Sequence, residues 1–280
     1  MSWRSLTLSA IVIASLPLAV NAQNFAPLDF SQNVQATNGM YPNMSTLGPE
    51  YYSGSSFDFV NVTMQGGLSI DARVTILGSA GSYEFVGWIP NYNSAAGQPA
   101  GDLGVYYRHT NDFSEPTGGI AYTISFYMGG GTFTTAATLD NVGFLVYDFD
   151  GEPGQSESIR VYNTDGFSGY RIGDSSGIQI QDEDGTWRFD AGGSNISETN
   201  ADGAFIAYFQ NTSSIRFDMF ATTFPSNPTA NNGVFAAFDG DLSLLGGDAS
   251  GFGHYVAVPE PHAAALTLVA TAMIMGRRRR

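Results

Sequence analysis

Two aspartates near the middle of the chain have the type and the spacing to take part in chemistry. Asp148 and Asp150 flank a phenylalanine, and Glu152 follows two residues later. On an extended strand, residues two apart share a face, which would place the two aspartate carboxylates roughly 7 Å apart. Carboxylates so placed can bind Ca²⁺, with Glu152 adding oxygens, although Gly151 comes too early for an EF-hand loop.

The same pair allows two other interpretations. Inverting glycosidases hold their two carboxyl groups about 6.5–9.5 Å apart, so Asp148 and Asp150 could serve as general acid and base. Alternatively, the segment is a strand end that runs into an Asp-Gly turn with solvated acids. The sequence favours the turn and leaves the cation site and the catalytic pair as alternatives. A second acidic cluster, at residues 182–185, is predicted to be a hairpin tip.

Residues 173–177 fit the Gly-x-Ser-x-Gly pattern of a serine nucleophile. That pattern needs a strand before it and a helix after it. Here residues 178–181 read Ile-Gln-Ile-Gln, which alternates like a strand. His109 is the one histidine that could act as the base, because His254 falls in a segment rich in glycine. We interpret the segment as a turn, and no catalytic residue is predicted.

Five aromatic residues could form a stacking platform for sugars: Trp88, Tyr92, Tyr106, Tyr107 and Trp187. The favoured interpretation is packing in the core or across strands, because large aromatic side chains dominate protein interiors.

Short strands are the elements that would position these residues. Segments rich in β-branched and aromatic residues alternate with turn clusters, and none keeps a helical period. We predict an all-β domain, an antiparallel β-sandwich or jelly-roll-like fold, over residues 56–239. In the segment 70–77, Asp71, Arg73 and Thr75 are expected to point outward. Tight hairpins are predicted at the Asp-Gly pairs that begin at Asp150, Asp165, Asp184, Asp202 and Asp239.

The flanks of this domain differ from it in composition. Residues 23–55 are polar and turn-rich, and we expect an irregular lead-in. Residues 240–257 are rich in Gly and Asp, which predicts a linker. The chain has no cysteine, so neither disulfides nor thiolate ligands are available. Residues 23–258 carry 25 acids and six arginines, an excess of 19 negative charges. Such a surface repels nucleic acid and favours solubility.

Residues 1–22 have the pattern of a secretory signal. Arg4 precedes an apolar run at residues 6–18, and Val-Asn-Ala follows it. Signal peptidase is expected to cut between Ala22 and Gln23, so that the mature chain begins at Gln23.

The last 23 residues, 258–280, combine three features. Pro259-Glu260-Pro261 stops any helix from continuing upstream and leaves an extended segment. Residues 263–275 are apolar, and as a helix they would be about 20 Å long, shorter than the ~30 Å hydrocarbon core of a bilayer. Snorkelling of the terminal arginines and thinning of the bilayer would cover the difference. The arginines stay cytoplasmic by the positive-inside rule; they are Arg277, Arg278, Arg279 and Arg280.

This tail resembles the PEP-CTERM sorting signal of Gram-negative bacteria in all three parts. The resemblance implies recognition by an exosortase, a membrane-embedded processing enzyme. It also implies a surface or matrix protein of an exopolysaccharide-producing species. A plain tail anchor without processing is the alternative. The expected route is through the inner membrane, held by residues 263–275, to the cell surface or extracellular matrix.

The leading hypothesis is an exported, non-enzymatic surface or matrix protein, adhesive or associated with exopolysaccharide. Two alternatives stay open: a secreted carbohydrate-active enzyme that uses Asp148 and Asp150, and a carbohydrate-binding module stabilised by Ca²⁺. Apart from that Ca²⁺, no cofactor is predicted. The expected partners are signal peptidase, an exosortase-like enzyme, the inner membrane and a polysaccharide, but not nucleic acid.

Overall fold

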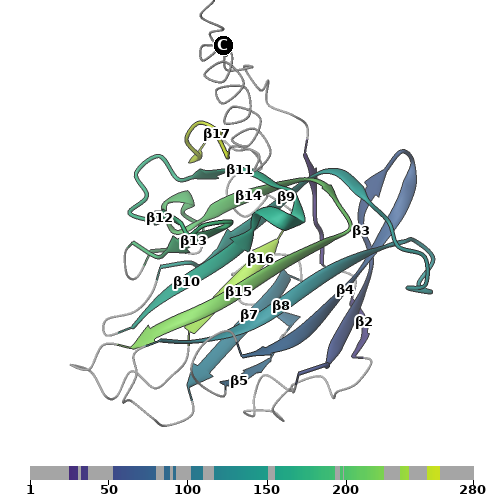
Figure 1. Cartoon of the computed structure of the whole chain (residues 1–280), viewed down its shortest axis with the longest axis horizontal. Helices are drawn as coiled ribbons and strands as arrows, with labels where there is room; N and C mark the ends of the chain where they lie inside the picture. Colours follow the sequence, from purple (N-terminus) through teal and green to yellow (C-terminus); the bar gives the residue numbers. More distant parts are fainter. Residues whose placement is uncertain are drawn as a thin grey trace, which may run out of the picture.

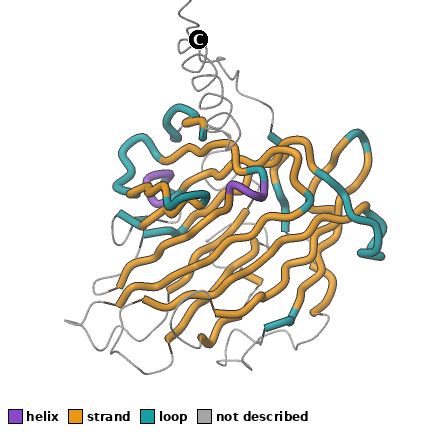
Figure 2. Tube along the Cα trace, viewed as in Figure 1, coloured by secondary structure: helices purple, strands orange, loops and turns teal. Residues whose placement is uncertain are grey.

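The computed structural model describes residues 25–30, 33–36, 53–79, 85–88, 91–92, 102–109, 117–150, 155–192, 196–197, 199–223, 234–239 and 251–258. Strands make up most of these residues (Figure 2). Helical structure among them is confined to two 3₁₀ turns, η1 (Asn163–Asp165) and η2 (Ala201–Gly203). The prediction of an all-β domain is confirmed.

Two sheets form the domain (Figure 1). The order in sheet A is β17 (Val256–Ala257), β11 (Phe167–Ile172), β14 (Phe205–Thr212), β9 (Leu139–Tyr147), β16 (Val234–Asp239), β7 (Asp102–His109) and β5 (Phe85–Trp88). Beside this path, β1 (Ala26–Pro27) pairs with β9, and β6 (Asn91–Tyr92) pairs with β7. The order in sheet B is β12 (Gln179–Asp182), β13 (Thr186–Asp190), β10 (Gln155–Tyr162), β15 (Ser214–Thr223), β8 (Thr117–Met128), β4 (Leu68–Ser79), β3 (Ser56–Gln65) and β2 (Asn33–Ala36). Among the described pairs all are antiparallel except β1 with β9.

The two sheets share one hydrophobic core that is rich in aromatic rings. Phe189 of sheet B stacks on Phe205 of sheet A, with 4.2 Å between ring centroids and 3° between planes. Phe217 of sheet B stacks on Tyr122, its neighbour in the same sheet, at 5.1 Å, and it reaches across to Phe144 of sheet A at 5.5 Å. Burying one such side chain contributes about 1.5–3 kcal/mol. These cross-sheet contacts hold the two layers face to face.

The Asp-Gly pairs that lie wholly within the described residues behave in two ways. Asp184 and Gly185 have φ of 49° and 96°, and the Glu183 N–H donates to the Thr186 carbonyl at 2.8 Å. Two positive φ values in a two-residue loop describe a type I′ hairpin, as predicted between β12 and β13. The prediction is wrong for Asp165, which ends η1, and for Asp202, which lies in η2.

Asp71 differs from the prediction. It is fully buried, not directed into solvent like its neighbours along the strand. One carboxylate oxygen accepts the Asn61 N–H at 3.0 Å, and the other accepts the Gly131 N–H at 2.7 Å. Both donors have left-handed backbones, with φ of 58° and 72°. The carboxylate therefore fixes an irregularity in β3 and the start of the loop after β8, and this loop covers it.

The last described segment, residues 251–258, is docked on sheet A. Its strand β17 pairs with Gly169 and Tyr170 of β11. The Val258 N–H donates to the Ser168 carbonyl at 2.9 Å, and the Tyr255 hydroxyl donates to the same carbonyl at 2.7 Å. A side chain at position 169 would clash, because a Cβ there would lie 2.4 Å from the Tyr255 ring and hydroxyl and from the Val256 carbonyl.

A second hydrophobic cluster lies under this segment. Phe252 is buried there with Leu145, Tyr147, Ile206 and Tyr208. Phe25, near the other end of the domain, places its ring 4.2 Å from that of Tyr208. The first and last described segments thus pack on the same side of sheet A.

The domain is therefore wider than the predicted range 56–239. The expected lead-in supplies β1, β2 and the buried side chains of Leu28 and Phe30. The expected linker, 240–257, ends in β17. Residues 1–22 and 259–280 lie outside the described residues, and so do Gln23 and all the predicted tail residues. No helix among the residues described here is long and apolar enough to cross a membrane.

Candidate functional site

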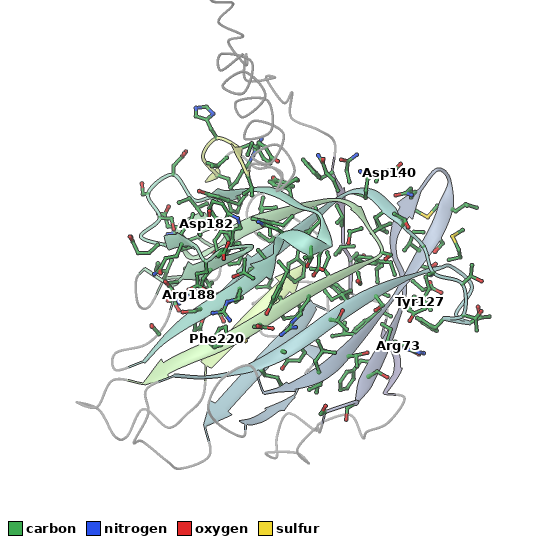
Figure 3. The ribbon with its side chains drawn as sticks, viewed as in Figure 1. Arg73, Tyr127, Asp140, Asp182, Arg188 and Phe220 are labelled. Atoms are coloured by element: carbon green, nitrogen blue, oxygen red, sulfur yellow. The ribbon has the colours of Figure 1, made fainter. Side chains whose placement is uncertain are left out.

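One tripeptide occurs twice in sheet B and places charge on its outer face. Arg188-Phe189-Asp190 lies on β13, and Arg216-Phe217-Asp218 lies on β15. Because successive residues of a strand point to opposite faces, each phenylalanine enters the core while its arginine and aspartate point outward. Figure 3 shows Arg188 among the side chains of this part of the molecule.

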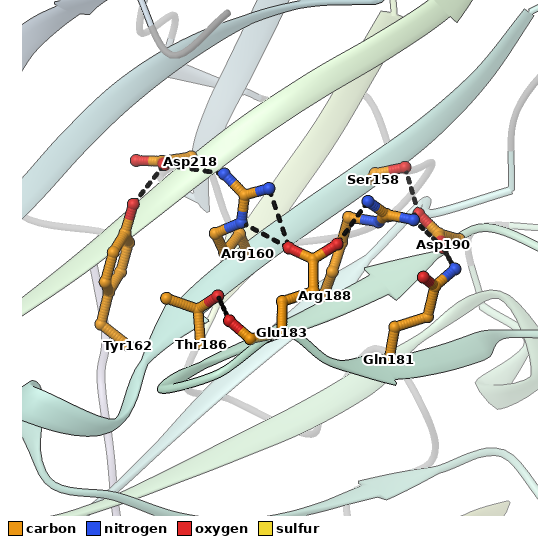
Figure 4. Close-up of polar contacts among 9 residues, drawn as sticks. All are labelled: Ser158, Arg160, Tyr162, Gln181, Glu183, Thr186, Arg188, Asp190 and Asp218. Atoms are coloured by element: carbon orange, nitrogen blue, oxygen red, sulfur yellow. Dashed lines mark hydrogen bonds and ion pairs between the residues drawn. The ribbon is translucent and has the colours of Figure 1, made fainter.

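Between these two strands lies β10, whose Arg160 links them. The arginine network is defined as Arg160, Arg188, Arg216, Glu183, Asp190 and Asp218. It spans strands β13, β10 and β15 and the turn between β12 and β13. Figure 4 shows all of its members except Arg216. Arg160 Nη2 lies 2.8 Å from Glu183 Oε2, and Arg160 Nη1 lies 3.7 Å from Asp218 Oδ2. Glu183 also pairs with Arg188, which donates its Nε–H to Asp190 at 2.9 Å. The charges alternate along the network, so each carboxylate is shared or capped.

Aromatic rings lie beneath two of the guanidinium groups. The Arg216 guanidinium carbon is 4.5 Å from the centre of the Tyr162 ring. The Arg160 guanidinium carbon is 4.8 Å from the centre of the Phe220 ring. Cation–π contact adds about 0.5–1 kcal/mol at exposed sites and orients the guanidinium plane. The network therefore presents its donors in fixed directions.

A separate ion pair lies further across the same face. Arg73 on β4 donates to Asp58 on β3 through Nε at 2.6 Å and Nη2 at 2.8 Å. The hydrogen bond to Asp58 raises the pKa of Arg73, although desolvation opposes the shift. Its guanidinium carbon also lies 5.2 Å from the Phe133 ring centre and 5.8 Å from that of Tyr127.

The outer face of sheet B thus holds most of the positive charge of the described domain. Four of the six arginines in residues 23–258 lie there: Arg73, Arg160, Arg188 and Arg216. On a domain with an excess of 19 negative charges, this face is locally balanced.

The hydroxyl of Tyr162 provides a measurable report on the network. It donates to Asp218, and burial together with that hydrogen bond raises the pKa of Tyr162 to about 12. Because folding favours the protonated form, its stabilising contribution is complete below pH 10 and is lost as the pH rises from about 10 to about 12. We expect Asp218→Asn to lower this pKa, since the anionic acceptor is removed.

The measurement is a base titration of ¹³C-labelled tyrosine by NMR, with Tyr162→Phe identifying the signal. An unchanged midpoint in Asp218→Asn would contradict the assigned role of the hydrogen bond.

Strand β9 ends before Asp148 and Asp150, as the favoured interpretation of this segment as a strand end expects. β9 stops at Tyr147, and Asp148 has a φ of 55°. Phe149 between them is buried in the core, and the Asp150 carboxylate accepts the Ile196 N–H. The two aspartates therefore do not share a strand face, and the premise of a regular 7 Å spacing is wrong.

Glu152 lies outside the described residues. Within the described ranges, no three histidine or acidic side chains gather to hold a metal ion. The Ca²⁺ alternative therefore gains no support from this geometry.

The Gly-x-Ser-x-Gly segment is a turn, as interpreted. The Ser176 N–H donates to the Gly173 carbonyl at 3.1 Å, and strand β12, not a helix, follows. The Ser175 N–H donates to the Asp202 carboxylate at 3.0 Å. Its expected partner His109 belongs to β7, at the far side of sheet A.

The five candidate platform aromatics do not lie on one sheet. Trp88 on β5 is opposite Tyr106 on β7. Tyr107, the next residue of β7, and Tyr92 on β6 lie in the same sheet, sheet A. Trp187 lies on β13 of sheet B, where its ring packs against Phe167 and Tyr170. The aromatic rings that do flank the polar face are those of Tyr162, Phe220, Tyr127 and Phe133.

No described protein family matches this sequence, and no curated protein matches it. Among solved structures, the fold is similar to the N-terminal domain of the Streptococcus gordonii adhesin Sgo0707. That match has a TM-score of 0.45 and 11% identity, and it covers 78% of this chain and 63% of that one. The chain thus spans less than two thirds of the Sgo0707 structure.

The adhesin domain of PrgB from Enterococcus faecalis is also similar. Its DNA-bound structure matches with a TM-score of 0.42 and 10% identity, over 66% of this chain and 67% of that one. A second PrgB structure matches with a TM-score of 0.41 and 10% identity, over 71% of this chain and 70% of that one.

Proposed function

We propose that this protein is an exported, non-enzymatic component of the cell surface or extracellular matrix that associates with polysaccharide. The observation that carries the proposal is the arginine network on the outer face of sheet B. It alternates guanidinium groups and carboxylates across neighbouring strands, with aromatic rings beneath two of the guanidinium groups. Sugar hydroxyls both donate and accept hydrogen bonds, so such a surface matches them along a chain.

The preorganisation of the network supports binding. Arg188 and Arg160 share Glu183, and Asp218 accepts from Arg216 and Tyr162. Side chains that are already ordered lose little conformational entropy when a ligand arrives. This arrangement favours a binding surface that does no chemistry of its own.

The two ends of the sequence support the location. The export signal at residues 1–22 and the PEP-CTERM-like tail after Val258 bracket the folded domain. In this proposal the signal peptide is removed after Ala22. An exosortase-like enzyme acts near Pro259-Glu260-Pro261, and Arg277–Arg280 hold the tail on the cytoplasmic side until then.

The first test is the intact mass and cellular fraction of the mature protein in its native host. We expect a mass that lacks residues 1–22 and the apolar tail, with the protein in the extracellular matrix. A mass that retains residues 263–280, with the protein in the membrane fraction, would reduce the tail to an anchor.

The second test is co-sedimentation of the mature protein with the purified exopolysaccharide of that host. Arg160→Gln interrupts the network and is expected to weaken binding, since the acceptor and donor pattern is broken. Arg171→Gln removes an arginine from sheet A and is the matched control. Equal binding of wild type and Arg160→Gln would show that the polysaccharide does not bind at the arginine network.

A further inference from the structure

A strip of small hydroxyl side chains crosses the outer face of sheet B beside the arginine network. Thr75 on β4 is opposite Thr123 on β8, which in turn is opposite Arg216 on β15. Two residues along, Arg73 is opposite Ser125, which is opposite Ser214. We define the hydroxyl strip as Thr75, Thr123, Ser125 and Ser214. Arg73 and Arg216 lie at its two diagonal corners.

The separation of these corners follows from sheet geometry. They are two strands apart and offset by two residues, which places their Cα atoms roughly 12 Å apart. The side chains between them are short, so neither guanidinium is covered by its neighbours in the strip.

At both corners the arginine is partly exposed and its carboxylate partner is buried. The Arg216 side chain is 43% exposed, against 2% for Asp218. The Arg73 side chain is 31% exposed, against 8% for Asp58. A ligand approaching the strip therefore meets guanidinium groups first, while the carboxylates of Asp58 and Asp218 lie below them. A further carboxylate near Arg216 is that of Asp165, which is half-buried and accepts the Arg216 backbone N–H.

Both guanidinium groups also have N–H groups that remain available to a ligand. Arg216 gives its Nε–H to Asp218, and Arg73 gives its Nε–H and one Nη group to Asp58. Across the described residues, no acceptor is assigned to either Nη group of Arg216 or to Nη1 of Arg73. By contrast, Arg188 uses its Nε and both Nη groups within the network. The corners are thus the positions where a new anion can be bound.

We propose that the hydroxyl strip binds an acidic polysaccharide, with carboxylates of uronic acid units on Arg73 and Arg216 and sugar hydroxyls on the threonines and serines between them. This inference rests on the proposed function and names its ligand class. Guanidinium groups bind carboxylates through charge-assisted hydrogen bonds, which are stronger than neutral ones. Two separated corners require a polymer with acidic groups at intervals along the chain.

The charge of the domain argues for sparse anions over dense ones. Duplex nucleic acid carries one negative charge per ~1.7 Å of its axis, and binding it takes many cationic contacts. This face offers two partly exposed arginines with N–H groups still available, on a domain with 19 excess negative charges. A polysaccharide with one carboxylate per sugar or fewer brings less repulsion with it.

The experiment measures binding of the mature exported protein to immobilised polygalacturonate, neutral dextran and duplex DNA of similar length. We expect wild type to bind polygalacturonate most tightly, with affinity that falls as salt is raised. The double variant Arg73→Gln/Arg216→Gln is expected to lose about tenfold or more, because two charge-assisted contacts are removed. Arg171→Gln on sheet A, which removes the same charge elsewhere, is expected to bind like wild type.

Separate measurements check that each variant is folded. The melting temperature and near-ultraviolet circular dichroism of each variant are recorded, and Arg216→Lys is included because it keeps the charge but loses the planar fork. It is expected to bind polygalacturonate more weakly than wild type and more tightly than Arg216→Gln. If the double variant does not fold, the binding of Arg216→Lys and of Ser125→Ala to polygalacturonate tests the proposal in its place.

The outcomes separate this inference from the function it rests on. Equal binding of dextran and polygalacturonate, unaffected by the double variant, overturns the acidic ligand and leaves polysaccharide association standing. Binding to none of these polymers and to no exopolysaccharide of the host overturns both proposals. Preference for DNA over polygalacturonate also overturns the inference.

Discussion

Replacing Phe189 by alanine is expected to lower the free energy of unfolding by about 3–5 kcal/mol. Phe189 is fully buried, and its ring stacks on Phe205 of the opposite sheet at 4.2 Å. It also contacts Phe167 and Tyr170 edge to face, at 6.3 and 5.5 Å. Alanine would leave a cavity between the sheets, which the three rings of sheet A cannot fill without moving their strands. Chemical denaturation followed by tryptophan fluorescence measures the loss.

A matched control is Leu77→Ala on β4, whose side chain is 42% exposed. We expect it to change the unfolding free energy by less than about 0.5 kcal/mol. If Phe189→Ala were as mild as Leu77→Ala, the aromatic stack between the sheets would not be a main source of stability.

Removing the carboxylate of Asp218 is expected to be the largest single loss on the polar face. Asp218→Ala leaves Arg216 and Arg160 without this partner, and the Tyr162 hydroxyl without its acceptor. Breaking a buried ion pair from one side costs about 3–5 kcal/mol. Here both arginines are partly exposed and regain water, so we expect a smaller loss of about 2–3 kcal/mol. Urea denaturation at neutral pH measures it.

The comparison is with Asp182→Ala, which removes an exposed carboxylate from the same sheet. Its effect is expected to stay within about 0.5 kcal/mol. Asp218→Asn should fall between the two, because the amide oxygen still accepts one hydrogen bond. A loss in Asp218→Ala no greater than that in Asp182→Ala would show that the network contributes nothing to stability.

Local sequence signals predicted the elements well. The type I′ turn at Asp184-Gly185 follows from the backbone preferences of two adjacent residues, and the flanking strands follow from alternation. These features depend on neighbours along the chain. The same alternation failed at Asp71, because the loop that buries it belongs to residues 60 positions away.

The arginine network shows the same limit. Tyr162 and Asp218 are 56 residues apart, and Arg160 and Glu183 are 23 apart. Their contacts depend on the strand order β12, β13, β10, β15, which the sequence does not specify. One signal was available. The repeated Arg-Phe-Asp tripeptide places two opposite charges on one face of a strand, and its two copies mark the face where the network forms.

The two alternatives in which Asp148 and Asp150 act as a pair are not supported, for a third reason. The metal and catalytic alternatives assumed a strand that continues through both residues, but β9 ends at Tyr147, Asp148 adopts a left-handed backbone and Phe149 is buried in the core. Aspartate tolerates this conformation better than most residues, so the residue type that suggested chemistry also permitted the strand to end.

The docking of β17 has a mechanical consequence. Val258 is buried and paired to Ser168, and the sequence continues directly into Pro259 without a spacer. A pull on the chain beyond Val258 therefore has no slack to take up. It reaches β11 first, through two paired residues and the hydroxyl of Tyr255. Force applied at this end would reach sheet B by two routes: along the chain through residues 163–166 into β10, and across the aromatic contacts between the sheets, among them the stack of Phe189 on Phe205.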